Sequence, residues 1–237
     1  MAIAYNAKVI TDGIGFYVDF ANSKSVTGVT LTDMSPNRLP ITITNTGTGS
    51  LSVINGYADF TPVSNTSTTA TFYTISNSYF TDNRTEITLE TAMYVYQDFG
   101  NSFFVRGVSP RVTESGSPLG FSLGSTSISA EINTATGWVT SNTVTPLISG
   151  YNKWYHITQT TSASAGQMKT YVNSQLVNTV NFVGTPTTGS GYLIGRGFFG
   201  GIQNYSGRVG FVRFYNRVLS EVEIQQNFDT TRGRYSI

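Results

Sequence analysis

The segment EITLETAMYVY (residues 86–96) decides the fold class of this protein. Its first residues alternate between polar and apolar side chains, which is the two-residue period of a β-strand with one face turned toward a core. Ile87 and Leu89 fall on one face of that strand, whereas Glu86 and Glu90 fall on the other. The segment therefore predicts a strand of a layered β-protein, and it also places two carboxylates on one face.

The same pattern recurs along the chain, with β-branched and aromatic residues in alternate positions. It predicts further strands at residues 14–20, 40–44, 70–75, 102–108, 119–124, 127–133, 153–160, 167–177 and 207–215. Short strands separated by Gly-, Ser- and Thr-rich turns are typical of an antiparallel two-sheet sandwich. Asn173-Ser174 suits a tight turn, so segment 167–177 is expected to fold back as two strands. Residues 44–70 and 109–118 show the weakest pattern and are expected to form long loops.

One helix is expected, in VLSEVEIQQNF (218–228) near the end of the chain. Ser220 is a suitable N-cap, and Glu223 follows three residues later, which is the spacing of a capping box. Leu219 and Ile224 occupy the positions of a hydrophobic staple. The apolar side that should dock this helix on the sandwich consists of Val222, Ile224 and Phe228.

Composition excludes several function classes. Only 11% of the 237 residues are charged and the net charge is +1, so the chain lacks the basic surface that attracts nucleic acid or anionic lipid. It has no cysteine, hence no disulfide and no thiolate metal site. No apolar run is long enough for a signal-peptide core or a membrane span. Because no linker or repeat interrupts the pattern, a single domain over residues 1–237 is expected.

Three segments carry a family signature. In residues 16–37 the matching positions are Asp19, Asn22, Lys24, Ser25, Asp33, Ser35 and Asn37. In residues 152–177 they are Trp154, His156, Tyr171, Val172 and Asn173. In residues 192–235 they are Ile194, Gly195, Arg196, Gly207, Val212, Tyr215, Asn216, Arg217, Leu219, Ser220, Glu223, Ile224, Asn227, Phe228, Arg234 and Tyr235.

Together these segments resemble the concanavalin A-like lectin/glucanase superfamily, in the laminin-G-like form found in tailed-phage structural proteins. The resemblance covers nearly the whole chain. It implies an all-β, antiparallel two-sheet jelly-roll sandwich with one short C-terminal helix. The sequence departs from the family pattern at Leu31 or its neighbour, where Trp is usual, and at Pro36 and Ser174, where Gly is usual. Because this fold hosts lectins, glycosidases and structural modules, the resemblance leaves the function open.

Some glucanases of this superfamily use a strand motif Glu-x-Asp-x-Glu, and Glu86, Thr88 and Glu90 stand at the corresponding positions. A retaining pair needs its carboxyl groups about 5–5.5 Å apart, whereas Cα atoms four residues apart on a strand are about 13 Å apart. Thr88 also cannot replace the central Asp, and the chain has only two Trp to stack on a sugar. We therefore expect a solvated strand face at Glu86 and Glu90, and no catalytic residues.

His156, the only histidine, could act as a general base, but no Cys exists and no activated Ser stands beside it, so it is expected to be a packing residue. Asp12, Asp82 and Asn83 supply loop oxygens that suit Ca²⁺. Short Asp/Asn turns are mostly only turns, so neither a metal nor a cofactor is expected.

The Gly-rich segment GYLIGRGFFGGIQNYSG (191–207) does not open a helix, which argues against a phosphate-binding loop. Two interpretations remain for its aromatic residues Phe198, Phe199 and Tyr205. Either they form an exposed apolar patch, which would mark an interface, or the segment is a hairpin with buried rings.

The favoured function is a non-enzymatic virion surface protein of a tailed phage. It would be a capsid decoration (cement-type) protein that binds the head lattice in many copies, made in the host cytoplasm and located on the virion. Its partners would be capsid or other virion proteins, copies of itself and surface glycans, with no nucleic acid and no membrane insertion. A carbohydrate-binding adhesin of a phage tail or fibre is the first alternative, and a glycoside hydrolase of the β-glucanase type is the second.

Overall fold

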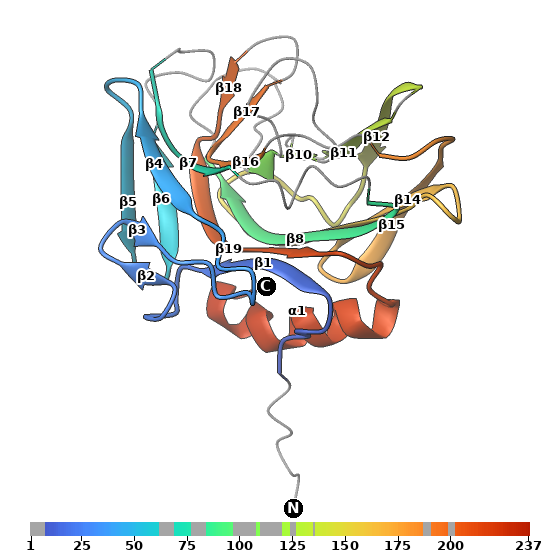
Figure 1. The fold of residues 1–237 in the computed structure, drawn as a ribbon, viewed down its shortest axis with the longest axis horizontal. Helices are drawn as coiled ribbons and strands as arrows, with labels where there is room; N and C mark the ends of the chain where they lie inside the picture. Colours follow the sequence, from blue (N-terminus) through green and yellow to red (C-terminus); the bar gives the residue numbers. More distant parts are fainter. Residues whose placement is uncertain are drawn as a thin grey trace, which may run out of the picture.

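The computed structural model describes residues 8–61, 69–76, 84–96, 108–109, 120–123, 127–134, 136–186, 191–198 and 202–237. Antiparallel strands fill most of this part of the chain, followed by a helix at its end (Figure 1). The predicted all-β sandwich is confirmed. Apart from residues 108–109, the strand expected at 102–108 and the loop expected at 109–118 lie outside the described residues.

The larger layer is an eight-stranded sheet. Its main path runs in the order β15 (Gln175–Asn181), β14 (Gln167–Val172), β13 (Trp154–Ser162), β8 (Glu86–Val95), β19 (Gly207–Tyr215), β6 (Tyr57–Thr61) and β5 (Ser50–Ile54). The eighth strand, β1 (Ile14–Asp19), pairs with the second half of β19, whereas β6 pairs with the first half. A register shift between Val209 and Phe211 separates these two halves of β19.

Shorter sheets form the opposite layer. One has the order β4 (Ile41–Asn45), β7 (Thr71–Ser76), β16 (Gly191–Ile194) and β9 (Val108–Ser109). Another consists of β10 (Gly120–Leu123), β11 (Ser127–Thr134) and β12 (Gly137–Val144). Two small hairpins join β2 (Val26–Thr27) to β3 (Thr30–Leu31) and β17 (Arg196–Phe198) to β18 (Ile202–Asn204).

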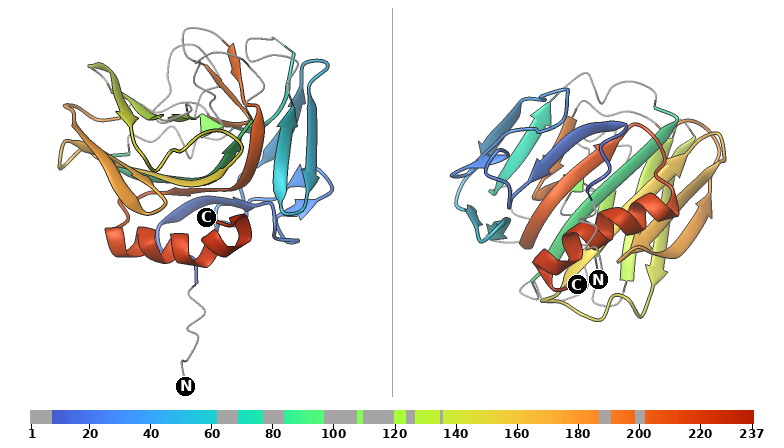
Figure 2. Two further views of the ribbon diagram at one scale, coloured as in Figure 1. Left: turned by 180° about the vertical axis from the view of Figure 1, so that it is seen from behind. Right: turned by 90° about the horizontal axis from the view of Figure 1, so that it is seen from below.

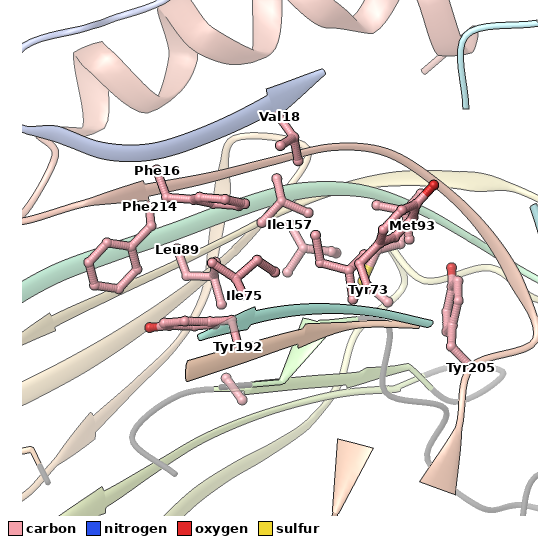
Figure 3. Packing of buried hydrophobic residues seen from close by; sticks show 14 of the residues in the cluster. Phe16, Val18, Tyr73, Ile75, Leu89, Met93, Ile157, Tyr192, Tyr205 and Phe214 are labelled. Atoms are coloured by element: carbon pink, nitrogen blue, oxygen red, sulfur yellow. The ribbon is translucent and has the colours of Figure 1, made fainter. Parts of the chain in front are cut away.

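The hydrophobic core lies between the two layers (Figure 3). Ile87, Leu89 and Met93 of β8 enter it from the larger sheet, and Tyr73 and Ile75 enter it from β7. None of these five side chains is more than 1% exposed. Burial of one large apolar side chain is worth roughly 1.5–3 kcal/mol, so the alternation in residues 86–96 fixes which face of β8 points inward.

Helix α1 (Glu221–Tyr235) lies on the outer face of the larger sheet, on the side away from the core (Figures 1 and 2). The predicted capping box is confirmed. The Ser220 hydroxyl accepts from the Glu223 N–H at 3.3 Å, and the Glu223 carboxylate accepts from the Ser220 N–H at 2.8 Å. Leu219 and Ile224 pack in one apolar cluster, as the staple requires.

The predicted docking side of the helix is confirmed for Ile224 and Phe228 but not for Val222. Val222 is 77% exposed, so its assignment to the docking side was wrong. The helix also continues seven residues beyond the predicted end at Phe228, and its added turns bring further buried side chains onto the sheet. The docking side consists of Ile224, Asn227, Phe228, Thr231 and Tyr235.

Two carboxylates of the opening signature, Asp33 and Asp19, hold together segments that are distant in the sequence. Asp33 accepts hydrogen bonds from the backbone N–H groups of Tyr17 and Leu39, at 2.9 and 2.8 Å. Asp19 is buried at the end of β1, and its oxygens lie 2.8 and 3.0 Å from Nη1 of Arg234 in the last turn of α1. Residues of the first and third signature segments are therefore joined in space and hold the helix end on the sheet.

The long loop expected at residues 44–70 is wrong for its middle part. Residues 50–61 form the β5–β6 hairpin, which belongs to the larger sheet. Its turn is Asn55-Gly56, where both residues have positive φ, 52° and 82°, and Asn-Gly is the strongest short signal for a two-residue hairpin turn. This hairpin signal is present in the sequence, but the many Thr, Ser and Asn residues on either side of it led to the prediction of a loop.

In the part of the chain that the structure describes, no helix has the length and apolarity needed to cross a membrane.

We expect Ser220→Ala to lower the free energy of unfolding by about 1 kcal/mol, because the capping bond to the first turn of α1 is lost. Urea unfolding measures this change. Val222→Ala is the matched control, since it alters an exposed side chain of the same turn and should change stability by less than about 0.5 kcal/mol. Equal losses in both variants would contradict the capping role.

Candidate binding surface

Helix α1 lies across the outer face of the larger sheet, and strands of the sheet are visible on both sides of it (Figure 2). Three regions of this face contain the polar and aromatic side chains that chemistry or binding would use. One is buried beneath the helix, one is a pocket beside its N-terminus, and one is a partly exposed row of side chains beside its C-terminus.

The region beneath the helix is a buried charge cluster. The Glu90 carboxylate of β8 accepts from Arg213 Nη1 of β19 at 2.9 Å and from Asn227 Nδ2 of α1 at 3.1 Å. Its other oxygen lies 3.2 Å from His156 Nε2 of β13. Glu90, Arg213 and Asn227 are 0% exposed and His156 is 1% exposed. Four elements therefore meet at one carboxylate that has no access to solvent.

Electrostatics keeps the Glu90 carboxylate ionised. Burial raises its pKa, but electrostatic attraction and hydrogen bonding to its partners His156 and Arg213 together outweigh burial, so the pKa lies below its ordinary value. Arg213 also stacks on Phe211, with its guanidinium carbon 4.0 Å from the ring centroid. A buried, ionised carboxylate with fixed partners cannot act as a general acid toward a substrate.

The prediction that Glu90 lies on a solvated strand face is wrong. The alternation of residues correctly predicted that Glu90 points away from the core. It gives no information about which element covers the outer face of the sheet. Asn227, on the buried side of α1, supplies one of the partners that make this burial tolerable. The predicted packing role of His156 is confirmed, because its ring is buried and lies 5.6 Å from Phe211 and 5.5 Å from Phe228.

Glu86 lies in a different environment on the same face. Its carboxylate accepts hydrogen bonds from the hydroxyls of Ser162 and Ser164, at 2.8 and 2.7 Å. It lines a pocket of about 260 Å³ beside the N-terminus of α1, together with Lys169 and Glu221 among others. Because Glu90 is enclosed beneath the helix and does not line this pocket, the two carboxylates form no catalytic pair.

The third region is a row of side chains that runs across four adjacent strands. Trp154 of β13 pairs with Tyr94 of β8, Tyr94 pairs with Arg208 of β19, and Arg208 pairs with Asp59 of β6. All four side chains are partly exposed, and we call them the aromatic row. Neighbouring strands are about 4.8 Å apart, so the row extends over about 14 Å.

Arg208 is held rigidly within this row. Its guanidinium carbon lies 4.6 Å from the ring centroid of Tyr57, 5.0 Å from that of Tyr94 and 5.3 Å from that of Tyr96. Its Nε donates to Asp59 Oδ2 at 3.1 Å and to the Tyr96 hydroxyl at 2.7 Å. Stacking and hydrogen bonding together fix the plane of the guanidinium.

Trp154 connects the row to the helix and to a pocket. Its ring centroid lies 4.6 Å from that of Tyr235 at the end of α1, and 5.6 and 5.8 Å from those of Tyr94 and Tyr57. A pocket of about 390 Å³ is lined by Trp154, Tyr94, Tyr235 and residues that include Lys153. The row and the pocket share two of their aromatic side chains and so form one continuous surface.

Those candidate metal ligands and aromatic residues of the Gly-rich segment that the structure describes belong to none of these three regions. Asp12 is exposed, and its carboxylate lies 2.9 Å from Arg217 Nε. Asp82 and Asn83 lie outside the described residues, and within the described ones no three metal-ligating side chains gather. Tyr205 is buried, with its hydroxyl donating to two backbone carbonyls, which favours the hairpin interpretation of the Gly-rich segment. Phe199 lies outside the described residues.

Sequence reasoning did not identify the aromatic row. Tyr94 and Trp154 occupy outward positions of two predicted strands, and Arg208 occupies an outward position of a third. These positions were visible in the alternation, but the pairing register that brings them side by side is set by contacts between strands distant in sequence.

Comparison with known proteins identifies the family. A sequence profile of the concanavalin A-like lectin/glucanases superfamily matches residues 66–225, which is more than half of the chain. The chain belongs to this superfamily. The sequence finds no match among curated proteins.

Several solved structures share this fold, and two of those described next are binding domains. The chain is similar to the binding domain of botulinum neurotoxin DC in complex with SialylT, with a TM-score of 0.67 and 14% identity. It is also similar to the binding domain of Paraclostridial Mosquitocidal Protein 1, with a TM-score of 0.68 and 15% identity. The chain is similar, with a TM-score of 0.70 and 14% identity, to a third structure, which belongs to botulinum neurotoxin type C. Cell entry of that toxin depends on interaction with two ganglioside molecules.

Each of these similarities covers 93% of this chain and 52% of the other, so the chain spans about half the length of these proteins. At sequence identities of 14–15%, the structural similarity shows a shared fold and does not by itself show a shared function.

We expect Glu90→Gln to lower the free energy of unfolding by about 3–5 kcal/mol, because it leaves Arg213 buried without its counterion. Glu86→Gln is the matched control, since the same substitution on the same face affects a carboxylate held by hydroxyls at a pocket, and it should cost less than about 1.5 kcal/mol. Urea unfolding of both variants measures the difference, and a Glu90→Gln variant as stable as Glu86→Gln would contradict the assignment.

Proton linkage predicts loss of stability in acid. Hydrogen bonding to Arg217 lowers the pKa of Glu223 to about 2, from a usual value of 4.5. A carboxylate whose pKa is lower in the folded than in the unfolded protein stabilises the folded state. This stabilisation is complete at a pH above the pKa of the unfolded state, and it is lost as the pH falls through the pKa of the folded state. The urea midpoint should therefore fall between about pH 4.5 and 2, and the fall should be smaller for Glu223→Gln. An identical pH profile in the variant would contradict this linkage.

Proposed function

We propose that this protein is a non-enzymatic carbohydrate-binding domain, and that the aromatic row contacts the glycan. The observation that carries the proposal is the arrangement of the row itself. Partly exposed Trp154 and Tyr94 stand beside an Arg208–Asp59 pair, on strands whose spacing the sheet fixes. Binding sites typically combine such apolar and aromatic lining with a few fixed polar groups.

Sugar chemistry matches this arrangement. One face of a pyranose ring presents C–H groups, which gain by leaving water and by lying against the electron-rich face of an aromatic ring. The hydroxyls around the edge of the ring need hydrogen-bond partners when water is displaced. The rings of Tyr57, Tyr94 and Trp154 suit the first requirement, and Arg208 and Asp59 suit the second.

Two further observations support binding without catalysis. Glu90 is buried beneath α1 and paired with Arg213, so the glucanase-like carboxylate pair is not available to a substrate. Two of the solved structures of similar fold are binding domains, one of them in complex with SialylT, and a third belongs to a neurotoxin whose cell entry depends on two ganglioside molecules.

We expect Trp154→Ala to weaken glycan binding by about tenfold or more, since exposed aromatic anchors carry much of a binding free energy. Trp138→Ala is the matched control, because it removes the other Trp, which is 41% exposed on β12 in a different sheet. Glycan-array screening followed by calorimetry measures binding. Tyr57→Ala removes a ring that stacks on Arg208 of the row and leaves in place the ring that packs on α1. Undiminished binding in both the Trp154 and the Tyr57 variant would contradict the proposed site.

The glycosidase alternative is tested by incubating the protein with a panel of polysaccharides and measuring new reducing ends. We expect no release above that of a heat-denatured sample. Turnover that is lost in Glu86→Gln, while the variant remains folded, would replace the binding proposal by a hydrolase with a different catalytic arrangement.

We also propose that the protein is displayed on the surface of a tailed-phage particle, as a capsid decoration protein or, alternatively, as a tail or fibre adhesin. The resemblance of residues 16–37 and 192–235 to phage laminin-G-like proteins supports this location, and the uncharged polar composition suits close packing of copies. Repeated copies would convert weak individual glycan contacts into strong adhesion. Counting copies in purified particles separates the two, since hundreds indicate the head and a few tens or fewer indicate the tail.

A further inference from the structure

We propose that the aromatic row selects a neutral glycan, and that Arg208 and Asp59 together hold two vicinal hydroxyls of one sugar ring. This inference rests on the proposed carbohydrate-binding function and names the class of sugar that the site would take. It is carried by three features of the row: the compensation of its charge, the atoms it leaves unbonded, and the rigidity of its polar pair.

The charge of the row is compensated. The guanidinium of Arg208 lies 3.1 Å from the Asp59 carboxylate, with 29% and 18% of the two side chains exposed. An acidic sugar placed on Arg208 would bring its carboxylate close to that of Asp59, and like charges at short range repel. Lys153 lines the adjoining pocket and is not part of the row, and its ammonium donates hydrogen bonds to the carbonyl and the hydroxyl of Ser149. The row therefore offers no uncompensated positive charge on Arg208 to an anion.

The pair keeps both a donor and an acceptor for a ligand. Arg208 uses Nε for its bonds to Asp59 and Tyr96, and its terminal nitrogens have no hydrogen-bond partner within the described part of the chain. Asp59 uses Oδ2 for both of its bonds, and its Oδ1 has none there. A guanidinium only donates and a carboxylate only accepts. One hydroxyl of a vicinal pair can therefore accept from Arg208 while its neighbour donates to Asp59.

The polar pair is fixed before any ligand arrives. The Tyr96 hydroxyl donates to Asp59 at 2.6 Å and accepts from Arg208 at 2.7 Å, which closes a three-membered hydrogen-bond ring. Burial, and then the hydrogen bond to Asp59, raise the pKa of Tyr96 well above its usual value, so the phenol stays protonated in neutral solution. Because little side-chain freedom remains to be lost, hydroxyl recognition costs less entropy at this pair than at mobile side chains.

The aromatic side chains place a sugar ring over this pair. Tyr57 and Tyr94 lie on either side of the register position of Arg208, from β6 and β8. A pyranose seated against the parts of these rings that Arg208 leaves uncovered would direct its edge hydroxyls at the terminal nitrogens of Arg208 and at Asp59 Oδ1. Trp154 and the adjoining pocket of about 390 Å³ provide room for a second ring of the same oligosaccharide.

The test compares neutral and acidic oligosaccharides of equal length by calorimetry at about 0.15 M salt, where exposed charges are screened beyond about 8 Å. Neutral gluco-, manno- and galacto-oligosaccharides should bind, and uronic-acid, sialylated and sulfated ones should bind at least about tenfold more weakly. Neutral deoxy analogues that lack either hydroxyl of the recognised pair should lose about tenfold or more, because a charge-assisted hydrogen bond is lost. The analogues leave the protein unchanged, so they do not depend on the folding of a variant.

Protein variants give a second measurement. Asp59→Asn removes the acceptor charge and should weaken neutral binding by about tenfold or more. Arg208→Lys keeps the positive charge but loses the planar donors, and should weaken binding similarly. Trp138→Ala is the control for both, and thermal unfolding verifies that each variant is folded.

The outcomes separate this inference from the function on which it rests. Neutral binding that depends on both hydroxyls and on Asp59 supports it. Stronger binding of acidic glycans that still depends on Trp154, or neutral binding unaffected by the deoxy analogues, overturns the inference and leaves the carbohydrate-binding function standing. Absence of binding to any glycan, by a folded protein, overturns both.

Discussion

The structure depends on one buried charge pair. Glu90 and Arg213 lie on neighbouring strands of the larger sheet, and both are completely removed from solvent. A buried ion pair is better tolerated where further hydrogen bonds stabilise its charges. Asn227 supplies one of these bonds from α1. The pair therefore requires the helix to sit directly above it, and the capping box at one end and the Asp19–Arg234 ion pair at the other hold it there.

This requirement decides which parts of the outer face of the larger sheet the helix covers. A helix placed over the middle of the outer face covers the carboxylate that an open sheet would have exposed, and so removes the strongest candidate for hydrolysis. The same placement presses Tyr235 against Trp154 and supports the end of the aromatic row. One packing arrangement thus encloses Glu90 and supports the end of the aromatic row, which is why we propose binding and not turnover.

The aromatic row suits adhesion because the sheet fixes its geometry. Its members come from adjacent positions on four strands, so their spacing is that of the backbone hydrogen-bond ladder. Stacking around Arg208 removes much of the remaining freedom. A surface prepared in this way loses little entropy on binding. On a particle that carries many copies, modest affinity at each row would be enough for firm attachment.

The sequence by itself determined the elements and their inward faces. The alternation in residues 86–96 correctly predicted that Ile87 and Leu89 are buried, and the spacing of Ser220 and Glu223 correctly predicted the capping box. Asn173 and Ser174 form the expected turn, with φ of 50° and 67°. These are local properties of a few consecutive residues. Only the tertiary structure decided that a helix covers Glu90 and that Trp154, Tyr94, Arg208 and Asp59 stand in one row. Both depend on which strands pair and in which register, and contacts between residues up to 149 positions apart, such as Asp59 and Arg208, set that register.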